Sequence, residues 1–425
     1  MMRMFRFYLY SVVLFALLFF YNSYFYGNFL ALFLQVSSPL IISTFLVFLG
    51  KNTFISSNSW LKKVYAYLLF FTISIFSYFG FTEGITGSHA ASPNPLIYGL
   101  SFYTAYLAFF IYNRDISLKE IFIAANPIVL ISGPMPVIFK PIVSSFSSRV
   151  RYYFPFIVIG FFFFKVISAP MTYYLVMLEN TNPVYILIFA VLFRVFLYFN
   201  FAGISLMAYG AMGIIGVKIP LNFTQPFSSR SVIEFWRSWH VALSSVLKVL
   251  FYDPVKSLSS NTSLALITVY IASAAWHGVS INFFYWGALH AFAFIISIRL
   301  LQRNYHFLAG LILLIAIPFG DIFFTDSDIT RLSIKMINFL SIDNYIFPNF
   351  REAIGAILAI PKYVLAATGV GLSIVAIEFF GYHTRIVGKK NYKFLRTKLS
   401  QTIIFLLILL LVSGQGIEYA AYGQR

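Results

Sequence analysis

The sequence predicts an all-α integral membrane protein, a polytopic bundle of about ten to twelve membrane-spanning helices. Three observations predict this fold. Of the 425 residues, 60% are hydrophobic and only 10% are charged, and the mean hydropathy is +0.84. A soluble domain carries about a quarter charged residues. Apolar runs of spanning length follow one another, and no hydrophilic stretch of domain length separates them, so we expect residues 1–425 to form one domain.

The apolar runs give the elements in order. The start, MMRMFRFYLYSVVLFALLFF, resembles a signal peptide but lacks a small-residue cleavage site, so we expect a retained first helix. The run 184–216 is interrupted by three glycines that permit a bend, and 262–300 is long enough for two helices broken near Gly278. The predicted spans are 5–26, 29–49, 64–82, 96–112, 121–139, 153–177, 184–216, 262–300, 307–324, 363–380 and 402–419.

The polar segments carry most of the charge. The loop 381–400 holds six Lys or Arg residues and no acid, so the positive-inside rule predicts a cytoplasmic position for it. Such loops account for the net charge of +17, and no nucleic-acid-binding motif accompanies them, so we expect no nucleic-acid partner. The piece ITRLSIKMINFL, residues 329–340, has the pattern of an amphipathic helix that lies on the membrane interface.

The chain contains no cysteine. An S-acyl-enzyme intermediate, a thiolate metal site and cysteine palmitoylation are therefore excluded. Any acyl chemistry must pass directly between substrates or through an oxygen or nitrogen group.

Polar and aromatic residues gather between Trp236 and His290, a region that holds four of the five tryptophans and three of the six histidines. Prolines at 220 and 226 prevent a simple spanning helix at the start of this region, and the serines at 228, 229 and 231 are good N-caps. A helix beginning there places Glu234 beside Arg237 and Trp236 beside His240. The alternative interpretation is an interfacial amphipathic helix anchored by tryptophan.

His277 lies in an apolar run that is rich in small residues, IASAAWHGVSINFFYWGALHAF. An ionisable group at membrane depth is costly, so it is a functional candidate by default. The alternative is a neutral structural histidine bonded to a neighbouring hydroxyl or carbonyl. We expect no metal site, because His277 and His290 have no nearby Asp or Glu to complete a ligand shell.

These blocks resemble the bacterial branch of the membrane-bound O-acyltransferase (MBOAT) family, which includes proteins of polysaccharide and alginate O-acetylation and of D-alanyl transfer. The resemblance covers residues 99–292. Its motifs are GLSFYT at 99–104, SGPM at 132–135, NFAGISLMAYG at 200–210, NFTQPF at 222–227, EFWRSWH at 234–240, WHG at 276–278 and WGALH at 286–290. The chain departs from the family pattern where Asn200, Ile204, Leu206 and Ser238 replace the family's usual Asp, Tyr, Asp and Arg.

The resemblance implies an O-acyltransferase with a central tunnel, in which an acyl group, expected to be acetyl, passes from a thioester to a hydroxyl. His277 is the candidate base, and His240 the candidate group that orients a substrate or handles a second proton. Asn222 is a candidate donor to the thioester carbonyl oxygen. The supporting residues are expected to be Glu234 and Arg237 as a partly buried pair, and Trp236, Trp239, Trp276 and His290 around the chamber.

The resemblance also implies the partners and the location. No bound cofactor is expected, and the acyl donor would be acetyl-CoA or an acyl-carrier protein. The acceptor would be an exported polysaccharide or lipid-linked glycan, with a separate extracytoplasmic acyltransferase as a further partner, and the chain would lie in the bacterial inner membrane. Two rival functions stay open: a transporter or flippase of lipid-linked glycan, and a non-catalytic scaffold of an export complex.

Overall fold

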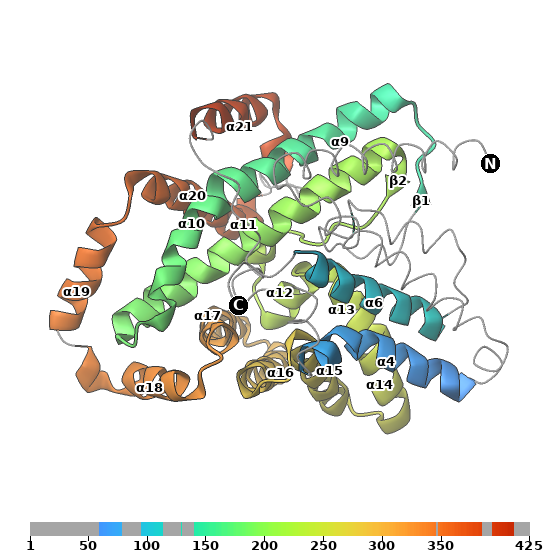
Figure 1. Cartoon of the computed structure of the whole chain (residues 1–425), viewed down its shortest axis with the longest axis horizontal. Coiled ribbons are helices and arrows are strands. Elements are labelled where there is room, and N and C mark those ends of the chain that lie inside the picture. The colour runs from blue at the N-terminus through green and yellow to red at the C-terminus, as the bar shows by residue number, and fades with distance from the viewer. Residues whose placement is uncertain are drawn as a thin grey trace.

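The chain folds as a bundle of helices in the computed structural model (Figure 1). The structure describes residues 59–78, 95–113, 129, 140–345, 347–384 and 393–411. The predicted spans 5–26 and 29–49 lie outside these residues, as does 121–139 apart from Val129. Within them the only strands are the two-residue β1 (Lys140–Pro141) and β2 (Val217–Lys218), which pair antiparallel. The predicted all-α membrane fold is confirmed.

Five helical segments in the described part are long and apolar enough to cross a membrane. They are Phe146–Leu175, Pro183–Ile215, Ile281–Gln302, His306–Thr325 and Lys362–Phe380, and the shorter apolar helices are Thr262–His277 and Lys398–Ile408. Each of them falls on a predicted span. The total of about ten to twelve crossings stays a prediction, because other predicted spans lie outside the described residues.

Two long antiparallel segments form one side of the bundle (Figure 1). The first joins α9 (Phe146–Phe161), the π-helical η1 (Phe162–Ser168), α10 (Ala169–Met171) and the 3₁₀ segment η2 (Thr172–Glu179), and the second is α11 (Pro183–Ile215). Helix α11 is continuous over these 33 residues. Its glycines allow close packing, since a methyl group at Gly203 or Gly210 would meet the backbone of α9.

The other side of the bundle is built from five helices that pack in pairs (Figure 1). They are α4 (Ser59–Tyr78), α6 (Pro95–Asn113), α15 (Thr262–His277), α16 (Ile281–Gln302) and α17 (His306–Thr325). The predicted run 262–300 is therefore two helices, broken at Gly278 as the sequence indicates. Because α15 ends there, His277 lies at the end of a helix rather than inside one.

Short helices connect the two sides. They are η3 (Pro226–Ser228), α12 (Val232–Ser238), α13 (Val241–Leu247), the π-helical η4 (Lys248–Tyr252) and α14 (Asp253–Ser259). Helix α12 begins after Ser231, whose hydroxyl accepts the Glu234 N–H at 3.3 Å, so the predicted N-cap is confirmed. The helix ends at Ser238, however, and the predicted continuous helix that pairs Trp236 with His240 one turn apart is wrong.

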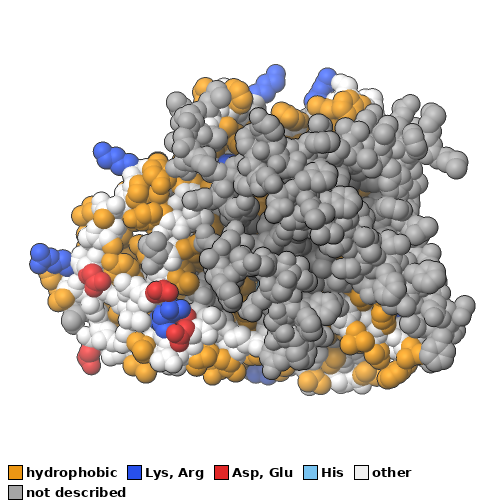
Figure 2. Space-filling view, viewed as in Figure 1, with side chains coloured by type: hydrophobic (Ala, Val, Ile, Leu, Met, Phe, Trp, Pro, Cys, Tyr) orange, Lys and Arg blue, Asp and Glu red, His pale blue; other side chains and the backbone are white. Residues whose placement is uncertain are grey.

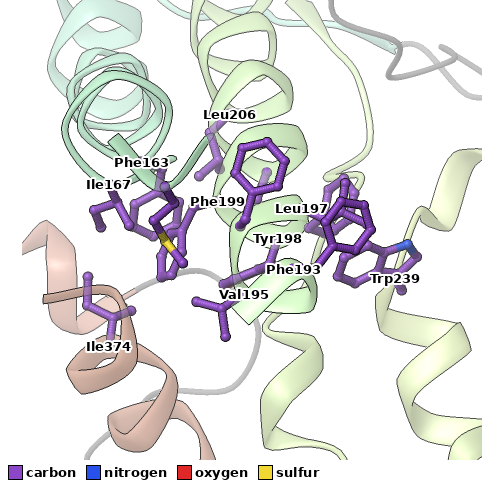
Figure 3. Packing of buried hydrophobic residues seen from close by; sticks show 14 of the residues in the cluster. Phe163, Ile167, Phe193, Val195, Leu197, Tyr198, Phe199, Leu206, Trp239 and Ile374 are labelled. Atoms are coloured by element: carbon purple, nitrogen blue, oxygen red, sulfur yellow. The ribbon is translucent and has the colours of Figure 1, made fainter. Parts of the chain in front are cut away.

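The main apolar core lies where α9, η1, α11 and α20 (Lys362–Thr384) meet. Figure 3 shows Phe163, Phe199 and Ile374 converging from three of these elements, with Trp239 beside the face of α11 that carries Leu197. Trp239 is 6% exposed and stacks on Phe235 at 5.4 Å between ring centroids. The short α12 segment is thus fixed to the longest helix by aromatic packing.

The remaining helices lie along the outer edge of the molecule (Figure 1): α18 (Ile329–Leu340), η5 (Ile342–Asn344), α19 (Phe347–Leu358), η6 (Lys393–Arg396) and α21 (Lys398–Leu411). Helix α18 coincides with the predicted amphipathic piece, and it exposes Ile337 at 67% and Leu340 at 71%. Figure 2 shows hydrophobic side chains over this part of the surface, with acidic and basic side chains among them, as expected for a segment that lies at the membrane interface.

Candidate active site

Elements from both sides of the bundle enclose a cavity of about 600 Å³. Its walls include Arg194 and Leu197 of α11, Trp236 of α12, Leu243 of α13, Tyr270 and His277 of α15, Trp286 and Phe294 of α16, and Asp321 and Phe324 of α17. Arg237 and Lys248 also line it and are exposed, so the cavity opens to the surface on their side. The volume lies within the range of small-molecule sites.

His240 lies at the junction between α12 and α13, in the left-handed backbone conformation with φ 49°. Non-glycine residues rarely adopt this conformation, and surrounding structure must hold it. Asn222 supplies that support: its carbonyl accepts the Val241 N–H at 2.8 Å, and its side-chain Oδ1 accepts the Ala242 N–H at 3.1 Å. The turn thereby directs the His240 imidazole into the cavity wall.

The His240 ring is packed between aromatic side chains. Phe102 of α6 stacks on it at 5.2 Å between centroids, and Phe223 approaches it at 5.8 Å. Burial lowers the pKa of His240 to about 4. The ring is therefore neutral near pH 7, and its Nδ1 has no hydrogen-bond partner among the described residues. A neutral imidazole has one N–H that can donate a hydrogen bond to a bound group and one bare nitrogen that can accept a hydrogen bond.

His277 reaches the same cavity from the C-terminal end of α15. The side chain is half-buried, and four aromatic rings surround its imidazole: Phe324 at 4.9 Å, Trp276 at 5.0 Å, Trp286 at 5.5 Å and Phe283 at 6.0 Å between ring centroids. The structure thus brings together the two histidines that the sequence singled out as catalytic candidates, although they lie on different elements.

Asn222 does not line the cavity. Its side chain is 3% exposed, and its Nδ2 donates to Ser205 of α11 at 3.3 Å while its Oδ1 is held by Ala242. The geometry therefore favours a positioning role over the predicted donation to a carbonyl oxygen.

Glu234 and Arg237 also differ from the prediction of a partly buried pair. Both side chains are exposed, and no ion pair joins them in the described part of the chain. Glu234 instead accepts the Arg230 N–H at 2.8 Å at the start of α12. A carboxylate there complements the helix N-terminus. The difference arises because Glu234 turns back toward the N-cap rather than forward along the helix.

The tryptophans divide between the cavity and its supporting wall. Trp236 and Trp239 line the cavity, as predicted, and so does Trp286, which was assigned only to a motif. Trp276 is not among the lining residues but contacts His277 and, at 5.2 Å, Phe102. Trp276 therefore packs directly against His277 and supports His240 indirectly, through the Phe102 ring that stacks on His240.

His290 lies just behind the cavity and is fully buried. Its ring contacts Trp236 and Trp286, each at 5.0 Å, and neither ring nitrogen has a hydrogen-bond partner among the described residues. Gly320 of α17 makes this position possible, because a methyl group there would overlap the imidazole. His290 thus supports the two tryptophans that form the cavity wall.

Sequence reasoning missed one charged pair in the cavity wall. Arg194 of α11 donates to Asp321 of α17 through Nε at 2.8 Å and through a second, shorter hydrogen bond from Nη2. Both side chains are almost fully buried. The signal was present, since each residue is an ionisable group inside a predicted span. Only the fold shows that the two meet.

Within the described residues, no group of three or more His, Cys, Asp or Glu side chains is placed to hold a metal ion. The arrangement that is present consists of two imidazoles, an ion pair and several aromatic rings around one cavity. Such a site suits proton transfer on a bound organic substrate.

Comparison with known proteins points to the same kind of site. Residues 151–320 match the sequence profile of the MBOAT, membrane-bound O-acyltransferase family. This segment is therefore similar to the membrane-bound O-acyltransferases. It runs from α9 into α17 and includes both cavity histidines and His290, so the predicted resemblance is confirmed.

Curated relatives match shorter segments. A peptidoglycan O-acetyltransferase of Helicobacter pylori is 35% identical over 131 residues, which cover 29% of this chain and 24% of the relative. A probable alginate O-acetylase of Azotobacter vinelandii is 39% identical over 97 residues, covering 22% and 19%. A teichoic acid D-alanyltransferase of Streptococcus thermophilus is 31% identical over 118 residues, covering 25% and 28%. In each case the matched part of the chain spans less than a third of the relative's length.

Proposed function

We propose that this chain transfers an acyl group from a thioester to a hydroxyl of a cell-surface polymer, within the cavity that holds His240 and His277. The observation that carries the proposal is the meeting of these two histidines in one cavity inside the segment that matches the acyltransferase family. Relatives named for acetyl transfer to peptidoglycan or alginate and for D-alanyl transfer to teichoic acid support the reaction class.

The chemistry follows from what a hydroxyl needs. An alcohol is a weak nucleophile, and a neutral imidazole removes its proton as the oxygen attacks the thioester carbonyl. His277 takes that proton, and the tetrahedral intermediate then releases the thiolate, which recovers the proton from the imidazolium. The products are an ester and a free thiol. No cysteine nucleophile is needed, in agreement with the composition.

His240 complements this step. Its low pKa keeps the ring neutral, and a neutral ring with one N–H can donate to the carbonyl oxygen as negative charge develops there. The left-handed turn held by Asn222 fixes the direction of the ring before the substrate binds. Preorganised donors of this kind lower the barrier because they need no rearrangement during the reaction.

The donor and the location complete the proposal. Acetyl-CoA is the proposed donor, with an acyl-carrier protein as the alternative, and the bacterial inner membrane is the proposed location. The exposed mouth carries Arg237, which suits an anionic donor, while the neighbouring Lys248 is paired with Asp253 at 2.7 Å. The acceptor is proposed to be an exported or lipid-linked glycan, with an extracytoplasmic acyltransferase as a further partner.

The test uses purified full-length protein, radiolabelled acetyl-CoA and glycan acceptors. We expect His277→Ala to lower ester formation by roughly 10²- to 10⁴-fold, the range of general base catalysis, and His240→Ala to lower it as well. His306→Ala is the matched control, because His306 is exposed at the first turn of α17 and does not line the cavity. Wild-type activity in His277→Ala would refute the proposed base. Glycan movement without ester formation would favour a transporter.

A further inference from the structure

Helix α20 carries a buried carboxylate that the proposed reaction does not use. Glu378 is fully buried and lies within Lys362–Phe380, a segment long and apolar enough to cross a membrane. In the described part of the chain no ion pair involves it. An ionisable side chain at membrane depth is costly, so its contacts should show what it contributes.

Glu378 holds a tyrosine of α11. The Tyr198 hydroxyl donates to Glu378 Oε1 at 2.5 Å, and the Tyr198 side chain is fully buried as well. The other carboxylate oxygen, Oε2, has no hydrogen-bond partner among the described residues. The contact thus uses one acceptor oxygen, and it fixes the Tyr198 ring where α20 meets α11.

The Tyr198 ring packs against the aromatic side chains behind His240. Between ring centroids, it lies 5.2 Å from Phe227 and 6.4 Å from both Phe223 and Trp239. Phe223 in turn contacts Trp239 at 5.0 Å and His240 at 5.8 Å. Because side chains in a close-packed interior have little free space, the position of Tyr198 constrains the rings beside His240.

We infer that Glu378 and Tyr198 are positioning residues that fix the His240 ring for acyl transfer, although neither lines the cavity. The inference rests on the proposed function, and Glu378 lies outside the segment 151–320 that matches the family. Asn222 holds the backbone of the turn, whereas Tyr198 holds the rings that pack on the imidazole. Loss of the Tyr198 hydrogen bond lets these rings shift, and a small displacement of a reacting group is costly in rate.

The experiment removes one tyrosine hydroxyl at each of two places along α20. Tyr198→Phe breaks the contact with Glu378. Tyr174→Phe is the matched control, because the Tyr174 hydroxyl shares a buried hydrogen bond with Thr368 of the same helix at 2.9 Å and does not line the cavity. For each variant, kcat and the KM for acetyl-CoA are measured on purified full-length protein in detergent, with thermal unfolding in parallel.

We expect the two tyrosine variants to lose similar stability, since each loses one buried hydrogen bond. Tyr198→Phe should lower kcat about ten-fold and leave KM within about two-fold of the wild-type value, whereas Tyr174→Phe should keep kcat within about two-fold. Equal kcat values in the two variants would overturn the inference.

Variants of Glu378 test the other partner of the contact. Glu378→Gln keeps an oxygen that accepts the Tyr198 hydroxyl, so it should retain most of the kcat that Glu378→Leu loses. Equal losses of kcat in these two variants would contradict the inference. Should Glu378→Leu fail to fold, the comparison of the two tyrosine variants decides.

A double variant tests whether the effect passes through His240. In the His240→Ala background, Tyr198→Phe should change kcat by less than about two-fold, because the ring that it positions is absent. A loss as large as in the wild-type background would show that Tyr198 acts independently of His240.

The proposed function fails separately, through ester formation that does not depend on His277. Hydrogen exchange then still tests the inference. The Val241 and Ala242 amides, which Asn222 accepts, should exchange about ten-fold faster in Tyr198→Phe than in Tyr174→Phe, because the rings that support the turn have loosened. Equal exchange at these amides would overturn the inference.

Discussion

The orientation of His240 depends on Asn222, which lies outside the cavity. Asn222 accepts from the backbone of both residues that follow His240 and ties the turn to Ser205 of α11. The side chain therefore acts on the site through the backbone of the turn. Sequence alone gives the residue type but not this role, because the left-handed conformation at a histidine has no sequence signal.

Replacement of this asparagine separates positioning from stability. We expect Asn222→Ala to cost about 1–3 kcal/mol of stability, since it leaves a buried N–H without its acceptor. Acyl transfer should fall further, by roughly ten- to hundred-fold, because a small misplacement of a reacting group is costly. Thermal unfolding and kcat measure the two effects. Asn338→Ala is the control, because it removes a hydrogen bond to the backbone away from the cavity lining and should lower stability only. Equal losses of kcat in Asn222→Ala and Asn338→Ala would contradict the positioning role.

Gly320 is the second residue on which the site depends. We expect Gly320→Ala to displace His290 and the tryptophans that pack on it, and to cost about 1–3 kcal/mol, as is usual for overpacking a core. Gly310→Ala on the same helix is the control, because its nearest neighbour lies at 3.6 Å and alanine favours the helix. Thermal unfolding in detergent tests the pair, and similar midpoints for both variants would show that the position of His290 is not constrained by Gly320.

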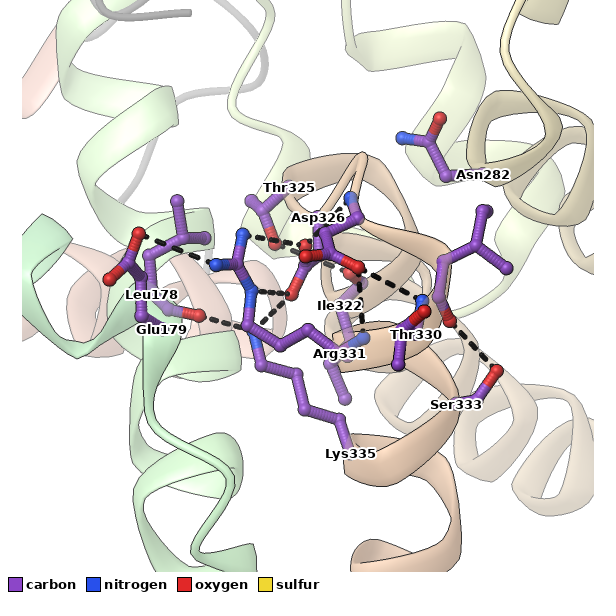
Figure 4. Close-up of polar contacts among 12 residues, drawn as sticks. Leu178, Glu179, Asn282, Ile322, Thr325, Asp326, Thr330, Arg331, Ser333 and Lys335 are labelled. Carbon is purple, nitrogen blue, oxygen red and sulfur yellow. Dashed lines mark hydrogen bonds and ion pairs between the residues drawn. The ribbon is translucent and has the colours of Figure 1, made fainter.

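Helix α18 shows how one element is fixed to the bundle by charge. Figure 4 shows Arg331 and Lys335 converging on Asp326, which is fully buried. Arg331 donates to it twice at 2.9 Å, and Lys335 donates at 2.6 Å and also reaches the Leu178 carbonyl. The polar face of an amphipathic helix is thus anchored, while its apolar face stays exposed.

This anchor gives a prediction for the element. Asp326→Asn leaves Lys335 buried without a counter-charge, and we expect a loss of about 3–5 kcal/mol, as is found when one partner of a buried pair is removed. Asp328→Asn, at the exposed N-cap of the same helix, should be near neutral because asparagine caps equally well. Chemical unfolding compares the two, and equal stabilities would show that the anchor contributes little.

The same anchor predicts a pH dependence. Burial raises the pKa of Asp326, but hydrogen bonds and charge from Arg331 and Lys335 outweigh it and hold the pKa below its ordinary value of 3.8. A carboxyl with a lowered folded-state pKa contributes its stability in full above the unfolded value and loses it as pH falls through the folded value. Below about pH 4, the midpoint of chemical unfolding of the wild type should therefore fall more steeply with decreasing pH than the midpoint of Asp326→Asn. Parallel curves for the two proteins would contradict this assignment.

At the scale of elements, much of the fold followed from the sequence. Apolar length located the spans, the serine N-cap located the start of α12, and the pattern of 329–340 gave α18. The glycines of α11 allow its close packing against α9. One expectation failed for an identifiable reason. The end of α12 was misplaced because Asn222, remote in sequence, stabilises the turn at His240.

The whole molecule determines what the site is. Arg194, His240, His277 and Asp321 lie on four separate segments, and only the packing of α11 against α17 and of the short helices between the two sides places them around one cavity. Motif spacing predicted the two histidines. It did not predict the ion pair, because nothing in one sequence tells which buried charges are neighbours.

The central claim is that the acyl group reacts in this cavity beside both histidines. An experimental structure of the full chain with a non-hydrolysable thioether analogue of acetyl-CoA and a bound glycan acceptor tests it most directly. We expect the acyl carbonyl in the cavity, with a His277 ring nitrogen within hydrogen-bond reach, about 2.6–3.2 Å, of the acceptor hydroxyl that faces this carbonyl. An analogue bound elsewhere, or an acyl group in the cavity directed away from both imidazoles, would contradict the account.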